Sequence, residues 1–143
     1  MNPTERLPDL LEDLSLLLLT SGDSDGARRL FEGLSELAGD EPATWMIGGL
    51  VSFAEGRYGE AERLYRQVLS VRTDHTGARC FLAESLIAQR RLGEAQAILE
   101  GLAADSPEDS PEGSFARALA EGIANGLFSR GGSAPRARSF ELR

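Results

Sequence analysis

The feature that most constrains this chain is an internal repeat with a period of 34 residues. Its clearest series is Ala27, Ala61 and Ala95. Repeats of about 20–50 residues are typical of stacked supersecondary units, in which each unit buries its apolar face against the next. Four further series keep the same spacing: Leu30, Leu64 and Ile98; Phe31, Tyr65 and Leu99; Leu34, Val68 and Leu102; and the small residues Ser15, Gly49 and Ala83.

Each copy of the repeat has the pattern of two helices. In the second copy, apolar residues recur at helical spacing from Trp45 to Phe53, Gly56 interrupts them, and a second helical pattern begins at Tyr58. The two-residue alternation typical of strands is missing from the sequence. The pattern therefore predicts an all-α chain with helical hairpins over about residues 5–38, 42–72 and 76–105.

A seventh helix is expected from about residue 113 to 128, with Phe115, Leu119 and Ile123 on one side. Stacked repeats need an atypical end piece to cover the last apolar face, and capping is the natural role for this helix. Residues 1–128 would then form one helical domain. In the first helix, Leu16 and Leu19 are surplus to the expected core stripe of Leu7, Leu10, Leu11, Leu14, Leu17 and Leu18.

The second copy resembles a known repeat family. Its residues Trp45, Gly49, Gly56, Tyr58, Ala61 and Tyr65 are similar to the tetratricopeptide repeat signature, at the spacing of that family. The resemblance implies three tetratricopeptide-like hairpins stacked as a short right-handed superhelix, closed by a C-terminal capping helix. Two positions depart from the family pattern. Thr73 replaces a closing proline, and Arg79 replaces a tryptophan-like residue.

Composition argues against several classes of function. The net charge of −8 disfavours binding to nucleic acid, which needs a basic face. His75 and Cys80 are the only histidine and the only cysteine, too few for a zinc site and without a third group to complete a catalytic triad. We therefore expect no enzymatic activity, no metal and no cofactor.

The N-terminal residues lack the basic segment and long apolar core of a signal peptide. The longest apolar run, Leu16 to Leu19, is far shorter than the roughly 20 residues needed to cross a bilayer. These features predict a cytoplasmic location.

Residues 129–143 have the composition of a disordered tail that contains several arginines. Such a tail can be an arm that docks on an acidic partner, or simply a solvated terminus. Its shortage of apolar residues favours the solvated terminus.

The resemblance implies that the first helix of each hairpin lines a concave groove that holds a partner. The peptide-carboxylate clamp of one tetratricopeptide subclass is absent, because its lysine and asparagine positions hold Glu12, Leu16, Met46 and Leu50. An apolar groove suits an amphipathic helix of another protein. Alternatively, these residues pack against the chain's own first or last helix, or close a homodimer. The predicted groove residues are Glu12, Leu16, Leu19, Met46, Leu50, Phe53, Cys80, Glu84 and Ile87.

A small acidic array of this kind resembles the tetratricopeptide chaperones of bacterial type III secretion. The needle-subunit chaperones share a leucine-rich opening helix and a glycine-containing turn, as in Leu10 to Gly22. The translocator chaperones are the near alternative. The resemblance implies that the chain keeps a self-assembling subunit soluble, with a small co-chaperone or a homodimer as further possibilities. The competing hypotheses are a generic scaffold, a homo-oligomeric assembly protein with no chaperone role, and a peptide-sensing regulatory domain.

Overall fold

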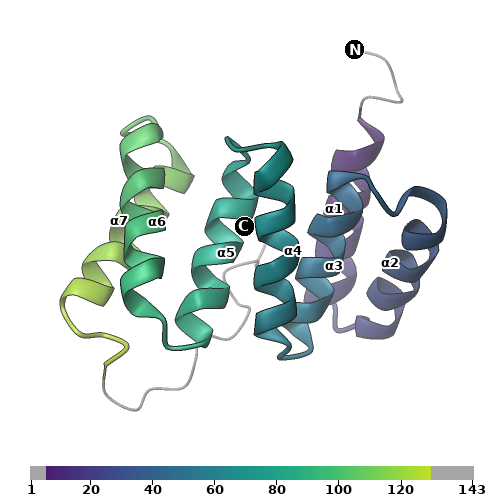
Figure 1. Ribbon diagram of the computed structural model, residues 1–143, viewed down its shortest axis with the longest axis horizontal. Helices are drawn as coiled ribbons and strands as arrows, with labels where there is room; N and C mark the ends of the chain where they lie inside the picture. The colour runs from purple at the N-terminus through teal and green to yellow at the C-terminus, as the bar shows by residue number, and fades with distance from the viewer. Residues whose placement is uncertain (1–5, 130–143) are drawn as a thin grey trace.

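The computed structural model describes residues 6–129, where all of the regular structure is helical (Figure 1). The all-α prediction, with three hairpins and one additional helix, is confirmed. The start of the first predicted hairpin and nearly all of the arginine-containing tail lie outside the described residues. Within this range the helices are α1 (Leu7–Thr20), α2 (Ser24–Ala38), α3 (Pro42–Ala54), α4 (Tyr58–Val71), α5 (Thr76–Ala88), α6 (Leu92–Asp105) and α7 (Pro111–Ala124).

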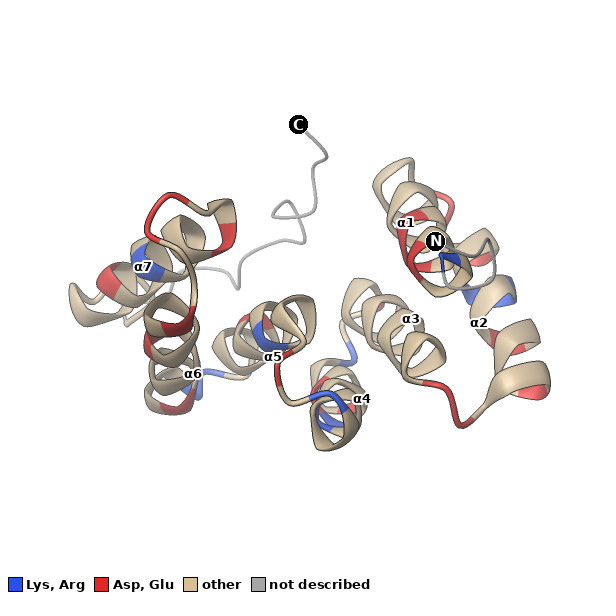
Figure 2. Cartoon of the chain, turned by 90° about the horizontal axis from the view of Figure 1, so that it is seen from above, with Lys and Arg blue, Asp and Glu red and all other residues tan. Residues whose placement is uncertain are grey.

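The helices follow an arc with two sides. Seen from above, α1, α3, α5 and α7 follow the inner side, whereas α2, α4 and α6 lie on the outer side (Figure 2). Helices that follow one another along the chain are in contact, and α3 also contacts α1. The first helix of each hairpin is therefore an inner helix. None of the helices within residues 6–129 is long and apolar enough to span a bilayer.

The small residues of the repeat lie where helices cross. Ala27, Ala61 and Ala95 are completely buried. A methyl group at Gly49 would collide with the ring of Tyr65, so the absence of a side chain lets α3 and α4 approach closely. The small residues of the repeat therefore let neighbouring helices pack closely.

Two clusters of buried residues form the core. The N-terminal core cluster consists of Ala27, Ile47 and Val51, with Leu11, Leu18, Leu19, Phe31 and Leu34 packed against it. The main core cluster joins α3 to α7 and contains Met46, Phe53, Ala61, Tyr65, Val68, Ala78, Cys80, Leu82, Ala83, Leu86, Ile87, Ala95, Leu99, Leu102, Ala116 and Ile123.

The core stripe predicted for α1 is wrong at four of its six positions. Leu11 and Leu18 do reach the N-terminal core cluster, together with Leu19, which was expected to be surplus. The rest of the expected stripe is exposed instead, because α1 is the first described helix of the array and packs mainly against α2 and α3. These exposed residues are Leu7, Leu10, Leu14 and Leu17.

Four of the described helices end in the same left-handed turn. In the first of these turns the N–H of Asp23 donates to the carbonyl of Leu18 at 2.8 Å, the long-range bond of a Schellman motif. The motif requires a positive φ, which glycine adopts at little cost. The residues that supply it are Gly22, Gly56, Arg90 and Gly126.

The last helix differs from its predicted range of 113–128. It begins earlier because Pro111 fits the first turn and the hydroxyl of Ser110 accepts a hydrogen bond from the N–H of Gly113 at 3.0 Å. It ends earlier because Gly126, at φ 78°, closes a left-handed turn. Phe115, Leu119 and Phe128 pack against the main core cluster, as expected of a helix that caps the array.

Candidate functional site

The predicted groove residues lie on three inner helices, three on each. We call these nine residues the concave set. Residues three or four apart share one face of a helix, which is why one register of the repeat selects the same face each time. The concave set comprises Glu12, Leu16 and Leu19 on α1, Met46, Leu50 and Phe53 on α3, and Cys80, Glu84 and Ile87 on α5.

The six members on α3 and α5 are buried, whereas the three on α1 are partly exposed. Leu50, Phe53 and Glu84 have only 2%, 4% and 3% of their surface exposed. Phe53 packs edge-on against Tyr58, with 5.1 Å between the ring centroids. These side chains therefore already have contacts within the chain, as the alternative of internal packing requires. Their role as a surface for a partner stays a prediction.

Glu84 places a carboxyl group in the buried part of the concave set. Burial raises the pKa of the Cys80 thiol to about 12, and the charge of Glu84 adds to this shift. Burial and Glu84 likewise raise the pKa of Tyr65, whose hydroxyl has no hydrogen-bond partner within the described part of the chain. A thiol with such a pKa stays protonated at neutral pH and is a poor nucleophile.

Glu12 adds a second carboxyl group at the partly exposed end of the set. Burial raises its pKa to about 7, with the charge of Asp9 contributing and that of Arg72 opposing. This carboxyl group therefore changes its protonation state near neutral pH.

His75 has a local structural role. It is the N-cap of α5, and its Nδ1 atom accepts a hydrogen bond from the N–H of Ala78 at 3.1 Å. Burial lowers the pKa of His75, and the nearby charge of Arg72 lowers it further. Only the neutral imidazole can accept this bond. Among the described residues, no group of three or more histidine, cysteine, aspartate or glutamate side chains could hold a metal ion.

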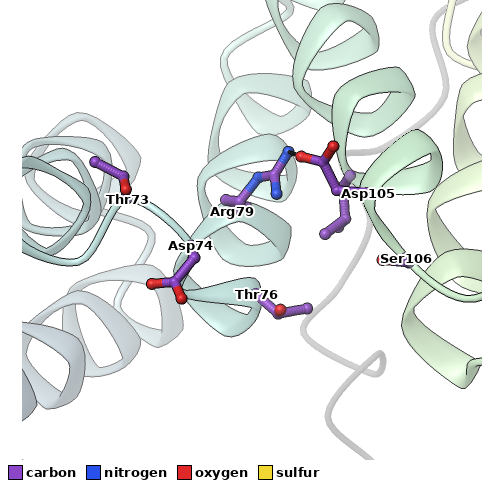
Figure 3. Close-up of a pocket in the computed structure, with 7 residues that line it drawn as sticks. Thr73, Asp74, Thr76, Arg79, Asp105 and Ser106 are labelled. Carbon is purple, nitrogen blue, oxygen red and sulfur yellow. Dashed lines mark hydrogen bonds and ion pairs between the residues drawn. The ribbon is translucent and has the colours of Figure 1, made fainter.

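A polar pocket of about 460 Å³ lies between the turn before α5 and the end of α6 (Figure 3). Arg79 crosses it and forms an ion pair with Asp105 at 2.9 Å. At the position that departs from the family pattern, an ion pair therefore joins α5 to α6. Neither His75 nor Cys80 lines the pocket, so it does not unite the chain's candidate nucleophile and base.

An apolar cavity of about 550 Å³ opens near the start of α1, lined by Leu7, Leu11 and Leu34 among others. The exposed α1 leucines continue from it along the helix. We call Leu7, Leu10, Leu14 and Leu17 the outer leucine stripe. Their steps of three, four and three residues form the seam pattern of paired helices, a signal that was present in the sequence but was assigned to the core.

The role of Arg90 was also not predicted from the sequence. It follows Gly22 and Gly56 in the 34-residue series, so the third repeat builds its left-handed turn with arginine in place of glycine. Such a conformation costs a residue with a side chain roughly 1–2 kcal/mol. The guanidinium of Arg90 donates to the carbonyl of Phe128 at 2.8 Å, which ties the end of the described chain to the end of α5.

Comparisons with known proteins agree with this geometry. A family profile described as "Tetratricopeptide repeat" matches residues 52–120. The fold is similar to that of the type III secretion translocator chaperone SycD of Yersinia enterocolitica, with a TM-score of 0.69 and 22% sequence identity over 89% of each chain. At this identity the likeness concerns the fold. No curated protein matches the chain in sequence.

Proposed function

We propose that this chain is a chaperone for a protein subunit, because a tetratricopeptide repeat profile matches residues 52–120 and the fold is similar to that of SycD. It holds an amphipathic helix of that subunit along the inner helices α1, α3 and α5. The client is a needle or translocator subunit of a type III secretion apparatus, kept soluble in the cytoplasm before export.

The observation that carries this proposal is the chemistry of the concave set. Seven of its nine residues are apolar or, like Cys80, behave as small apolar groups, and they are spread over three neighbouring helices. An amphipathic helix presents apolar side chains along one stripe and matches such a surface. Glu12 and Glu84 would repel a C-terminal carboxylate, which argues against the peptide-clamp mode.

The burial of Leu50 and Phe53 changes how a client binds. Because Leu50 and Phe53 are buried, a client helix that binds at these positions has to replace contacts that their side chains already make within the chain. Glutamate at either position would place a charge in a buried site and would risk unfolding the array. A sound test therefore uses the partly exposed end of the concave set.

The test is site-specific photo-crosslinking from α1, in cells that co-express needle and translocator subunits of the source organism. One benzoylphenylalanine replaces Leu16 of the concave set, and another replaces Leu10 of the outer leucine stripe as a matched control. We expect the subunit to stay monomeric and to crosslink from position 16. Crosslinking from position 10 alone would place the client on the outer face. A subunit that aggregates equally with and without the chain would contradict chaperoning.

The outer leucine stripe favours a second candidate, a homo-oligomeric assembly protein. Leu10 and Leu17 are 59% and 53% exposed, and an apolar seam of this kind is typical of helices that pair. The same stripe suits a small helical co-chaperone. Self-association through the stripe, or binding of a co-chaperone there, is compatible with a client on the inner helices. The outer leucine stripe and the concave set occupy different faces of α1.

A further inference from the structure

We propose that the apolar cavity near the start of α1 binds one aromatic side chain of a partner protein. The cavity measures about 550 Å³ and is lined mainly by α1, the end of α2 and the start of α3. No residue of the concave set lines it. The site is therefore separate from the surface assigned to a client, and the inference does not depend on the proposed function.

The 34-residue register relates this cavity to the polar pocket of the third repeat. Leu11 lines the cavity and stands 34 residues before Trp45, which stands 34 residues before Arg79 of the polar pocket. Three further lining residues of the cavity are equivalent to three of the pocket: Leu34, Leu37 and Ala38 correspond to Leu102, Asp105 and Ser106. Each repeat therefore has the same site, between the first turns of its first helix and the end of its second helix.

The second and third repeats occupy this site with their own side chains. Trp45 packs against the main core cluster, and its indole N–H donates to a backbone carbonyl of the α2–α3 turn at 2.9 Å. In the third repeat Arg79 and Asp105 form their ion pair across the pocket (Figure 3). Leu11 and Leu37 stand at the same two positions of the first repeat. Two leucines cannot form an ion pair, and neither is as large as an indole, so an apolar cavity remains there.

The indole of Trp45 indicates which kind of group fits the first repeat. Repeats of one array share a common helix arrangement. A site that accommodates an indole in the second repeat can therefore take a ring of similar size in the first, where Leu11 and Leu34 offer apolar contacts. Aromatic side chains that fill such pockets are frequent anchors of protein interfaces.

One side of the cavity is held in place before any partner binds. The hydroxyl of Thr44 donates to the carbonyl of Ala38 at 2.8 Å, and the N–H of Glu41 donates to the same carbonyl at 3.1 Å. These bonds fix the turn between α2 and α3, which carries several of the lining residues. A preformed pocket loses little conformational entropy when it is filled.

Two opposite charges at the cavity define the partner further. Glu41 and Arg72 both line it, and both are exposed. Within residues 6–129 neither side chain forms an ion pair. A partner with a basic group near Glu41 and an acidic group near Arg72 complements both charges. On a helix, residues three or four positions from the aromatic residue share its face, so the base and the acid are expected one turn to either side of it.

The apolar rim favours a protein over a free amino acid as the source of the ring. Leu7 and Leu37 line the cavity and are 52% and 86% exposed. A single amino acid within the cavity would leave most of this rim in water, whereas a protein partner covers it.

The test uses the full chain and N-acetyltryptophanamide, a neutral aromatic residue, as the probe. We expect NMR resonances of Leu37, Glu41 and Thr44 to shift as the probe binds. Leu11→Trp gives the first repeat the residue of the second and should weaken probe binding at least tenfold. Leu10→Trp adds the same side chain outside the cavity and is the matched control. An absence of shifts at the lining residues, or a folded Leu11→Trp chain that binds like wild type, would overturn the inference.

A second variant does not depend on repacking the interior. Leu37→Asp gives the exposed rim the residue that the third repeat has at Asp105, and it should weaken probe binding at least fivefold. Leu17→Asp, on the outer leucine stripe and outside the cavity, is its control and should leave the affinity unchanged. Equal affinities of these two variants for the probe would also overturn the inference.

Two further probes test the chemistry of the occupant. N-acetylleucinamide should bind at least fivefold more weakly than N-acetyltryptophanamide, and equal affinity would contradict an aromatic occupant. Free tryptophan should bind no more tightly than the amide. A fivefold preference for free tryptophan would assign the cavity to an amino acid and overturn the assignment to a protein.

The flanking charges are tested with helical peptides that contain one tryptophan. A peptide with a lysine and a glutamate one turn to either side, in the better of the two orders, should bind at least threefold more tightly than the same peptide with alanines there. The gain should vanish in the Glu41→Gln, Arg72→Gln chain. Equal binding of the charged and the alanine peptide by the wild-type chain would contradict the partner chemistry inferred from these two residues.

Discussion

The carboxyl group of Glu12, a member of the concave set, makes the stability of the folded chain depend on pH. Its pKa rises from 4.5 to about 7, so the folded chain binds this proton more tightly than the unfolded chain does. Stability then falls as the pH rises from about 4.5 to about 7, and above that range the full cost of the buried charge remains.

We predict that Glu12→Gln makes the chain more stable than wild type at pH 8, by about 1–2 kcal/mol after allowance for partial exposure. Near pH 4 the difference should largely vanish, because Glu12 is then mostly protonated in both states. Urea denaturation at the two pH values measures this. Glu36→Gln, on the exposed side of α2, is the control, and an equal effect from that change would contradict a specific role for Glu12.

Ala61 tests the register of the repeat at a single residue. It is completely buried where α3 and α4 pack, so a larger side chain has to push the helices apart. We predict that Ala61→Leu destabilises the chain by about 1–3 kcal/mol through overpacking. Thermal unfolding provides the measurement. A melting temperature equal to that of the wild type would show that this crossing is not tight.

At the scale of the helices, a glycine in a left-handed turn and a glycine inside a helix affect stability in opposite ways. Gly56 ends α3 at φ 76°, whereas Gly59 lies inside α4 with open space where a side chain would be. We predict that Gly56→Ala destabilises by about 1 kcal/mol, because alanine resists a positive φ. Gly59→Ala should stabilise by about 0.5–1 kcal/mol, since alanine favours a helix. Chemical denaturation of both variants checks the pair, and shifts of the same sign would refute the assignment.

The helices were predictable because their signals are local. Apolar spacing, the break at Gly56 and the 34-residue period all lie within short stretches of sequence. The side of a helix that ends up buried is less local, and the leucines of α1 show this. Leu11 and Leu10 are equally apolar, but only Leu11 meets the N-terminal core cluster, because nothing in the described array packs beyond α1.

For the whole molecule, the repeat register placed the nine predicted groove residues on α1, α3 and α5. The register did not predict that Leu50, Phe53 and Glu84 are buried, because burial depends on groups that are distant in sequence. The strained turn at Arg90 was equally hidden, although its place in the series of Gly22 and Gly56 was visible. Local pattern thus assigns residues to one face of a helix, whereas the burial of that face depends on long-range packing.

The outer leucine stripe makes a prediction about assembly. Its four leucines are spaced as in a two-helix seam, and a further helix lying against α1 would bury the part of each side chain that is now exposed. We therefore expect the purified chain to self-associate as its concentration rises, with a mass above the 15.4 kDa of one copy by light scattering.

Leu10→Gln with Leu14→Gln should return the chain to 15.4 kDa at every concentration. Full burial of a leucine contributes about 1.5–3 kcal/mol, and Leu10 and Leu14 have about half of their surface left to bury, so losing both from each of two copies weakens association by roughly a hundredfold or more. The helix itself should persist, because glutamine is a good helix former. Leu37→Gln is the control, since Leu37 is 86% exposed but lies on α2, outside the stripe. A wild-type chain that stays at 15.4 kDa would rule out a homo-oligomer and leave the stripe to a different helical partner.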